Sequence, residues 1–245
     1  MLSAFLWGLL ATSSLILGGI IACRFALSKR TVGIIMAFGA GTLISAVSYE
    51  LIFEAVRIAT FSGFPALGLF TGAFAFYGSD RLIGRLSGGE PVDLDASPQS
   101  RLVVPMVLAI ILDGVPESIV IGLGISGEGV VSLAMLVAIF ISNLPEAIAG
   151  SIGMKAGGVS RRKIILLWFV IALVCAVASV AGYSLFREAS DRWLAFVQAF
   201  AGGAILMMLA NSMIPEAYEH GGKLAGVFTV LGFSVSVSMV ILERT

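Results

Sequence analysis

The chain has 245 residues, of which 58% are hydrophobic and 12% are charged, and its mean hydropathy is +1.04. Its 15 Lys and Arg balance its 15 Asp and Glu, so the formal net charge is zero. These values exclude a water-soluble globular protein, which needs a more polar surface, and they predict an integral membrane protein.

Apolar runs in chain order predict eight membrane-spanning helices, because about 20 residues cover the hydrocarbon core. They fall at roughly 4–23, 32–54, 64–80, 102–125, 130–153, 163–186, 193–217 and 223–242. The runs lack the two-residue alternation of a membrane barrel, so the expected fold class is all-α, a polytopic helix bundle. We expect a single transmembrane domain, 1–245, with a flexible cytoplasmic loop at 84–101 between the third and fourth spans.

The distribution of cations predicts how the bundle is oriented. Eleven of the 15 Lys and Arg border one set of loops, and four border the other set. Cytoplasmic loops carry the excess of Lys and Arg, so both termini are expected to be extracytoplasmic.

Two internal similarities suggest that the bundle contains inverted repeats. Residues 112–119 (LDGVPESI) are similar to 141–148 (ISNLPEAI), and residues 37–55 are similar to 199–217 at a constant offset of 162. The charge-based orientation makes the members of each pair run in opposite directions, which is typical of transporters. The alternative is chance similarity, since small residues recur in membrane helices for packing reasons alone.

Acidic and amide side chains accompany a proline in both the fourth and the fifth span. Asp113 and Glu117 share one helix face, and Asn143 and Glu146 share a face of the next helix. Pro116 and Pro145 each remove a backbone donor, so the carbonyls four residues earlier, at Leu112 and Ile141, become free acceptors. The pattern therefore gathers oxygen ligands at two helix interruptions.

Placing these acids near the centre of the membrane costs free energy. Each carboxylate at the centre of a membrane helix costs about 2.5–3.5 kcal/mol, so Asp113, Glu117 and Glu146 together cost about 8–10 kcal/mol. A bound divalent cation would offset this cost, and so would protonation. The structural alternative is that the acids are protonated and form hydrogen bonds that hold the helices together.

The eight spans, the external termini and the paired Pro-Glu motifs resemble the ZIP (Zrt/Irt-like) family of divalent metal transporters. The seventh span adds a further similarity at 214–217 (IPEA). The resemblance covers nearly the whole chain and implies a metal site shared by the fourth and fifth spans, binuclear in some members.

The chain also departs from the family motifs, in which the fourth span commonly reads His-Asn-x-Pro-Glu-Gly. Asp113 stands at the usual His, Gly114 at the usual Asn, and Ser142 at the usual His or Gln, whereas Asn143, Glu117 and Glu146 match. We expect one oxygen-rich site formed by Asp113, Glu117, Ser142, Asn143 and Glu146. Such a shell suits Mn²⁺ or Fe²⁺ better than Zn²⁺, although ligand type alone does not settle the preference.

Further polar residues mark a candidate path. Glu50 and Glu54 lie near the outer end of the second span, where they could collect cations or form an ordinary solvated helix end. Glu216, Glu219 and His220 lie at the inner end of the seventh span and could form an exit relay, and Asn211 lies one to two turns before Glu216, where members of the family often carry a ligand. The 84–101 loop contains three acids that could weakly attract cations, namely Glu90, Asp93 and Asp95. An ordinary solvated loop is the simpler interpretation.

The sequence therefore predicts a carrier of divalent metal ions (Zn²⁺, Fe²⁺ or Mn²⁺) into the cytoplasm by alternating access. The alternative is a non-transporting metal-sensing or scaffold relative. An intramembrane hydrolase would need a HExxH, GxGD or serine-based motif, which the sequence lacks, so we expect no enzyme activity. The metal ion is expected as substrate, without an organic cofactor. Expected partners are metal ions and the lipid bilayer, with a homodimer left open and no nucleic acid, in a bacterial inner membrane.

Overall fold

A computed structural model describes residues 1–59, 62–86, 103–127 and 131–245 of the chain. Every regular element in these residues is a helix, which confirms the expected all-α fold class. Most of the polar connection expected at 84–101, including Glu90, Asp93 and Asp95, lies outside the described residues.

The helices follow the expected spans closely. The first three elements of the chain are α1 (Leu2–Arg24), the continuous run of α2 (Lys29–Ala46), η1 (Val47–Ile52) and α3 (Phe53–Ile58), and α4 (Phe64–Leu86). They are followed by α5 (Val103–Gly127), α6 (Leu133–Ala156) and α7 (Arg161–Phe186). The last elements are the continuous run of α8 (Asp191–Met208), η3 (Leu209–Met213) and α9 (Ile214–Gly221), and then α10 (Lys223–Glu243).

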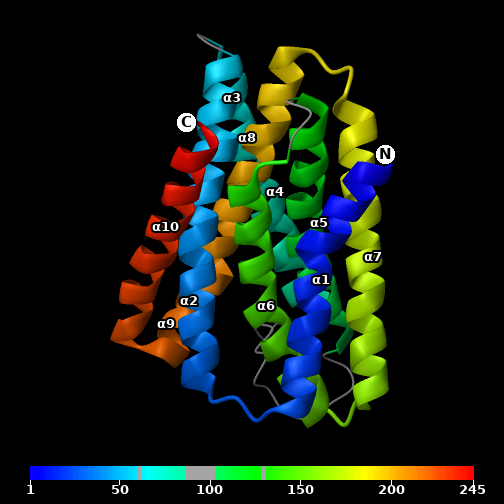
Figure 1. Cartoon of the computed structure of the whole chain (residues 1–245). Coiled ribbons are helices and arrows are strands. Elements are labelled where there is room, and N and C mark those ends of the chain that lie inside the picture. The colour runs from blue at the N-terminus through cyan, green and yellow to red at the C-terminus, as the bar shows by residue number, and fades with distance from the viewer. Residues whose placement is uncertain (60–61, 87–102, 128–130) are drawn as a thin grey trace.

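The helices are long and apolar enough for an integral membrane protein. Six of the described helical runs have the length and composition needed to cross a bilayer; they are α1, α2 to α3, α6, α7, α8 to α9, and α10. The other two, α4 and α5, have 23 and 25 residues, which at about 1.5 Å per residue also match the bilayer thickness. Successive helices run up and down the bundle, and both termini lie in its upper part (Figure 1).

Local sequence signals explain where several helices begin and end. The Ser28 side chain accepts a hydrogen bond from the Thr31 N–H at the start of α2, and Ser132 does the same for Met135 in α6. Gly222, with φ of 61°, makes the sharp turn from α9 into α10, which glycine adopts without strain. The two π-helical turns, η1 and η3, were not expected from the sequence.

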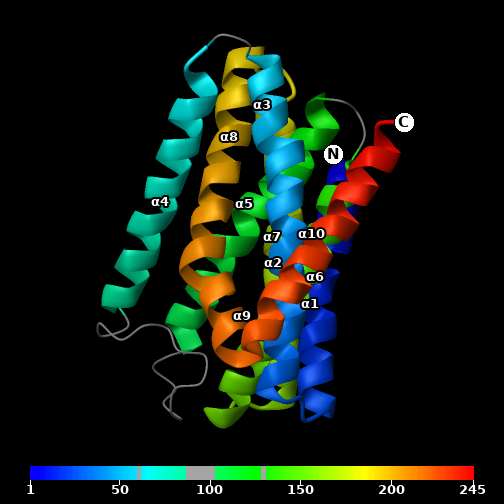
Figure 2. The same cartoon turned by 90° about the vertical axis from the view of Figure 1, so that its left-hand side faces the viewer.

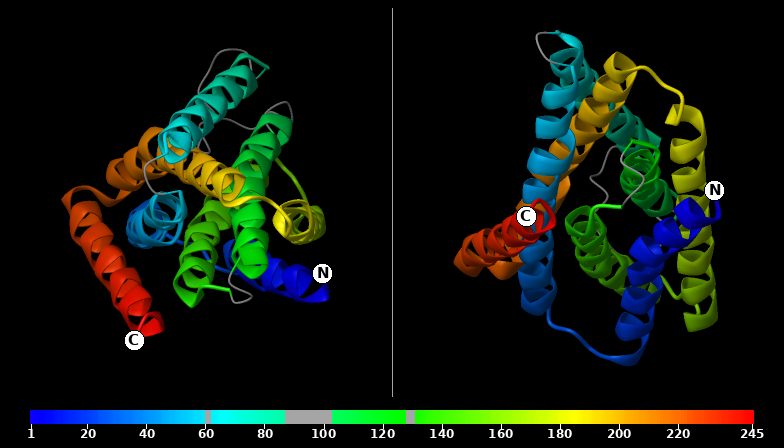
Figure 3. Two further views of the ribbon diagram at one scale, coloured as in Figure 1. Left: turned by 90° about the horizontal axis from the view of Figure 1, so that it is seen from above. Right: turned by 45° about the horizontal axis from the view of Figure 1, so that its top comes forward.

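The helices fall into two groups that are packed most extensively within themselves. In the four-helix group, α1 packs against α6 and α7, and α5 packs against α7. In the second group, α2 packs against α10 and α4 against α8, and contacts of η1 with α8 and of α2 with α9 join these pairs. Figures 2 and 3 show α4 and α10 on the outer flanks of the bundle. The groups meet mainly where α2 packs on α6 and α5 on α8.

Reciprocal glycines bring three of the helix pairs into backbone contact. A Cβ atom on either glycine of a pair would overlap a backbone carbonyl oxygen of the facing helix. The pairs are Gly41 with Gly232 between α2 and α10, Gly72 with Gly203 between α4 and α8, and Gly122 with Gly182 between α5 and α7. In a bilayer, where helices gain little from the hydrophobic effect between them, this close approach supplies much of the packing energy.

Gly41→Ala should destabilise the bundle by about 1–3 kcal/mol, because the added methyl overlaps the carbonyl oxygen of Thr229 and forces α2 and α10 apart. The midpoint of thermal unfolding in detergent would measure the change. Gly226→Ala is the matched control, because Gly226 lies in α10 with open space around it, and its midpoint should stay the same or rise. Equal effects of the two substitutions would contradict this account of the packing.

Candidate metal centre

The centre of the candidate site is a buried carboxylate without a hydrogen-bond partner. Glu117 lies in α5, one residue after the helix-internal Pro116, and is only 1% exposed. Neither of its carboxylate oxygens accepts a hydrogen bond from a described residue. Leaving such a group unpaired is expensive, so these oxygens are available for a cation or a proton.

The neighbouring helix α6 presents an amide to the same place. Asn143 is 2% exposed and lies beside the Glu117 carboxylate, but its amide nitrogen does not reach hydrogen-bonding geometry. Ser142 is fully buried, and its hydroxyl donates to the Ile139 carbonyl at 3.0 Å. The oxygen atoms of Asn143 and Ser142 keep lone pairs that can bind a cation.

The other predicted acids lie close enough to interact electrostatically. Asp113 repels Glu117, and Glu146 is repelled by Asp113, Glu117 and Glu216. The structure therefore brings together the predicted acids of α5 and α6 and adds Glu216 from α9. A cluster of like charges at membrane depth requires compensation by a cation or by protons.

Asp80, in α4, is a member of this cluster that the sequence analysis missed. Its carboxyl group is an electrostatic neighbour of Asp113. In the sequence, Asp80 stands at the predicted end of the third span. Charged residues are common at such membrane interfaces, so its position alone did not mark it as a site residue. The packing of α4 against α5 brings it near Asp113.

The carboxylates alone do not form a closed coordination sphere. Among the described residues, no three His, Cys, Asp or Glu side chains converge closely enough to hold a metal ion. A cation held here would therefore also draw on amide, hydroxyl or backbone carbonyl oxygens, as hard cations commonly do in proteins.

Backbone carbonyls are available because of the prolines. Pro116 and Pro145 lie inside α5 and α6 and lack the N–H groups that Leu112 and Ile141 would otherwise bond. Gly39 of α2 packs against the interruption in α6, where an added Cβ would lie 3.0 Å from Ser142 Cα and 3.4 Å from the Ile141 carbonyl oxygen. The site thus lies where the two helix groups meet.

Gly114, four residues before Ser118 in α5, packs against α7. A Cβ atom at this position would lie 3.1 Å from Sγ of Cys175 in α7. A longer side chain at 114 would have to displace that sulfur atom, so the local packing fits glycine.

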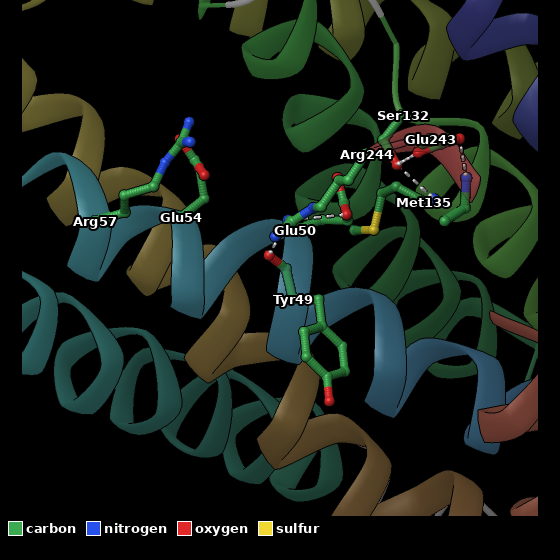
Figure 4. Close-up of polar contacts among 9 residues, drawn as sticks. Tyr49, Glu50, Glu54, Arg57, Ser132, Met135, Glu243 and Arg244 are labelled. Carbon is green, nitrogen blue, oxygen red and sulfur yellow. Dashed lines mark hydrogen bonds and ion pairs between the residues drawn. The ribbon is translucent and has the colours of Figure 1, made fainter. Parts of the chain in front are cut away.

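The predicted entrance acids are both paired with arginines. Glu54 accepts from Arg57 at 2.7 Å, and Glu50 contacts Arg244 at 3.4 Å. Figure 4 shows both pairs along the same stretch of helix. A cation that reaches either carboxylate has to compete with a guanidinium group.

Only some of the predicted exit residues lie near the buried acids. Glu216 is half-buried and interacts electrostatically with Glu146. His220 lies one turn further on, with Nδ1 3.1 Å from the Glu216 carbonyl oxygen and its backbone packed against Gly33 of α2. Asn211, in η3, is exposed, so the structure does not bring it into the buried cluster.

Comparison with models of known protein families finds no match to this chain, and comparison with curated protein sequences finds none either.

Glu117→Gln should abolish the stabilisation of the protein by metal ions, because an amide supplies no anionic oxygen. At a Mn²⁺ concentration of about 100 times the dissociation constant, the wild type should gain about 2.7 kcal/mol, measured as a rise in the unfolding midpoint in detergent. Without metal, the variant should be no less stable than the wild type, since it removes an unpaired buried charge.

Glu188→Gln is the control, because Glu188 is exposed and lies just after the end of α7, outside the proposed path, and this variant should keep the full metal-induced rise. A Glu117→Gln variant that also keeps the full rise would show that Glu117 is not a ligand.

Proposed function

We propose that the protein is a divalent metal cation transporter of the ZIP type, which carries Zn²⁺, Fe²⁺ or Mn²⁺ toward the cytoplasm by alternating access. The main support is the buried Glu117 carboxylate, whose two oxygens are unpaired and which lies beside Asn143 in a cluster of acids. Intramembrane carboxylates at helix interruptions typically mark ion pathways. A metal ion is the substrate here, and no enzyme activity is proposed.

We further propose that the bundle contains an inverted repeat relating α2 to α8. The π-helical turns support it, because η1 begins at Val47 and η3 begins at Leu209, and these positions have the same 162-residue offset as the sequence similarity. Gly41 and Gly203 have this offset too, and each meets a carbonyl oxygen of its neighbouring helix. The two helices run in opposite directions in the bundle (Figure 1).

The proposed orientation places both termini outside the cytoplasm. In its support, the end of the bundle opposite the termini carries exposed cations at the ends of α1 and α6 and at the starts of α2 and α7; they are Arg24, Lys29, Arg30, Lys155, Arg161, Arg162 and Lys163. Such an excess is typical of a cytoplasmic surface. We propose the inner membrane of a bacterium as its location.

We propose that the site holds one metal ion in an oxygen-rich shell. Asp113 replaces an imidazole ligand of the family, and Gly114 offers no second ligand while facing Cys175. Carboxylate, amide and carbonyl oxygens suit harder cations such as Mn²⁺ and Fe²⁺.

The two helix groups offer a route to alternating access. The candidate ligands on α5 and α6 belong to the four-helix group, whereas Glu216 and Gly39 belong to the second group. A displacement of one group against the other would carry the ligands of α5 and α6 past α2 and α9 and would open the site to each side in turn.

Uptake of radiolabelled Mn²⁺ or Zn²⁺ into proteoliposomes tests the proposed function. The wild type should accumulate the ion, whereas Glu117→Ala and Glu146→Ala should fall to the level of protein-free liposomes. Glu188→Ala, at an exposed position just after α7, should transport like the wild type. Equal uptake by the wild type and both site variants would contradict a carrier that uses this site, and binding without uptake by the wild type would favour a metal-sensing role.

A further inference from the structure

The last turn of α10 is hydrogen-bonded to the first turn of α6. The carboxylate of Glu243 accepts from Oγ of Ser132 at 3.1 Å and from the backbone N–H of Ala134 at 2.9 Å (Figure 4). Ser132 is the N-cap residue of α6, so Glu243 lies at the positive end of that helix, where a carboxylate is favourable. Two hydrogen bonds therefore fix the start of α6 to α10.

The next residue, Arg244, holds the same turn of α10 against η1. Its Nη2 atom donates to the Tyr49 carbonyl at 3.0 Å and contacts the Glu50 carboxylate at 3.4 Å. Its guanidinium also lies 5.6 Å from the centre of the Phe53 ring, within range of a cation–π interaction. Together, Glu243 and Arg244 connect α6, α10 and η1 at one end of the bundle.

The contacts of Glu243 cross between the two helix groups, whereas those of Arg244 lie within the second group. Hydrogen bonds within the four-helix group connect α7 to α1, α6 to α1 and α7 to α6; they are Ser179 to Ala4, Thr12 to Ala172, Lys155 to Ala22, and Trp168 to Ser151. The bonds of Glu243, in contrast, run from the second group to the four-helix group. A movement of one group against the other that separates α6 from α10 has to break them.

Beneath the connection, η1 and the first turn of α6 contribute to one buried apolar cluster, whose part near Met135 we call the seam. Met135 of α6 is 3% exposed and belongs to the same buried cluster as Val47 and Leu51 of η1. A π-helical turn such as η1 is a strained interruption of a helix and is common at functional sites. Its Tyr49 carbonyl is one of the groups that Arg244 occupies.

We propose that Glu243 and Arg244 form a latch that holds this end of the bundle closed, and that releasing the latch separates α6 from α10 and exposes the seam around Met135. The inference deepens the proposed transport and rests on it, because the latch is the connection that a relative movement of the groups must open. In the proposed orientation it controls the extracytoplasmic side, next to Glu50. Because Arg244 pairs with Glu50, a cation that binds Glu50 has to displace Arg244, and this displacement releases one side of the latch.

Thiol labelling of the seam tests the latch without requiring transport. The reporter is Met135→Cys, in purified protein in detergent whose native Cys23 and Cys175 are replaced by Ala, and the probe is a water-soluble maleimide. Glu243→Ala should increase the labelling rate of the reporter at least about tenfold, since a hydrogen bond to a charged group changes an equilibrium by about that factor. Glu243→Gln, which keeps a neutral acceptor, should give a smaller increase.

Glu188→Ala is the matched control, because Glu188 forms an exposed ion pair with Arg187 away from the seam, and it should leave the labelling rate unchanged. A rate in the Glu243 variants equal to that of the control would overturn the latch, whatever the transport result. Faster labelling in a protein that fails to transport would instead support the latch and reject the proposed function.

Discussion

Backbone contact at glycines is the constraint on which this bundle depends. Membrane helices gain little from burying apolar side chains against each other, so their association relies on close packing. Three helix pairs meet through reciprocal glycines whose Cβ positions are taken by carbonyl oxygens of the facing helix. These pairs hold α2 to α10, α4 to α8 and α5 to α7, and they leave the contact of α2 with α6 as a principal boundary between two groups. The buried acids lie at this boundary, so the packing that builds the bundle also places the candidate site.

The site combines features that are each costly in a membrane. Glu117 is buried with both oxygens unpaired, and Asp113 and Glu146 add repulsion. The prolines of α5 and α6 free two carbonyl groups close to these acids. A cation would compensate all of these costs at once, whereas a purely structural network would be expected to satisfy its own hydrogen bonds. Because the Glu117 oxygens are unpaired, we favour a transported ion over a purely structural role for these acids.

Much of the architecture could be predicted from the sequence, because a membrane helix is encoded by a local apolar run. The expected runs agree with the helix ends within four residues, except that α4 extends six residues past the expected end at 80. The i to i+4 spacing of Asp113 and Glu117 correctly placed them on one face. Asp80 was missed, because its neighbour Asp113 lies on another helix and a single sequence does not reveal that contact. The π-helical turns were missed because no residue type marks them. The arginine partners of Glu50 and Glu54 depend on rotamers and on the position of α10, so the sequence could not distinguish free entrance acids from paired ones.

In this structure one divalent cation is proposed to bind between α5 and α6. Anomalous diffraction from crystals soaked in Mn²⁺, with data collected on both sides of the metal absorption edge, tests it most directly. We expect a single anomalous peak within coordination distance of Glu117 and Glu146, and no such peak in Glu117→Gln crystals. Peaks confined to the ends of the bundle, or an unchanged peak in the variant, would contradict it.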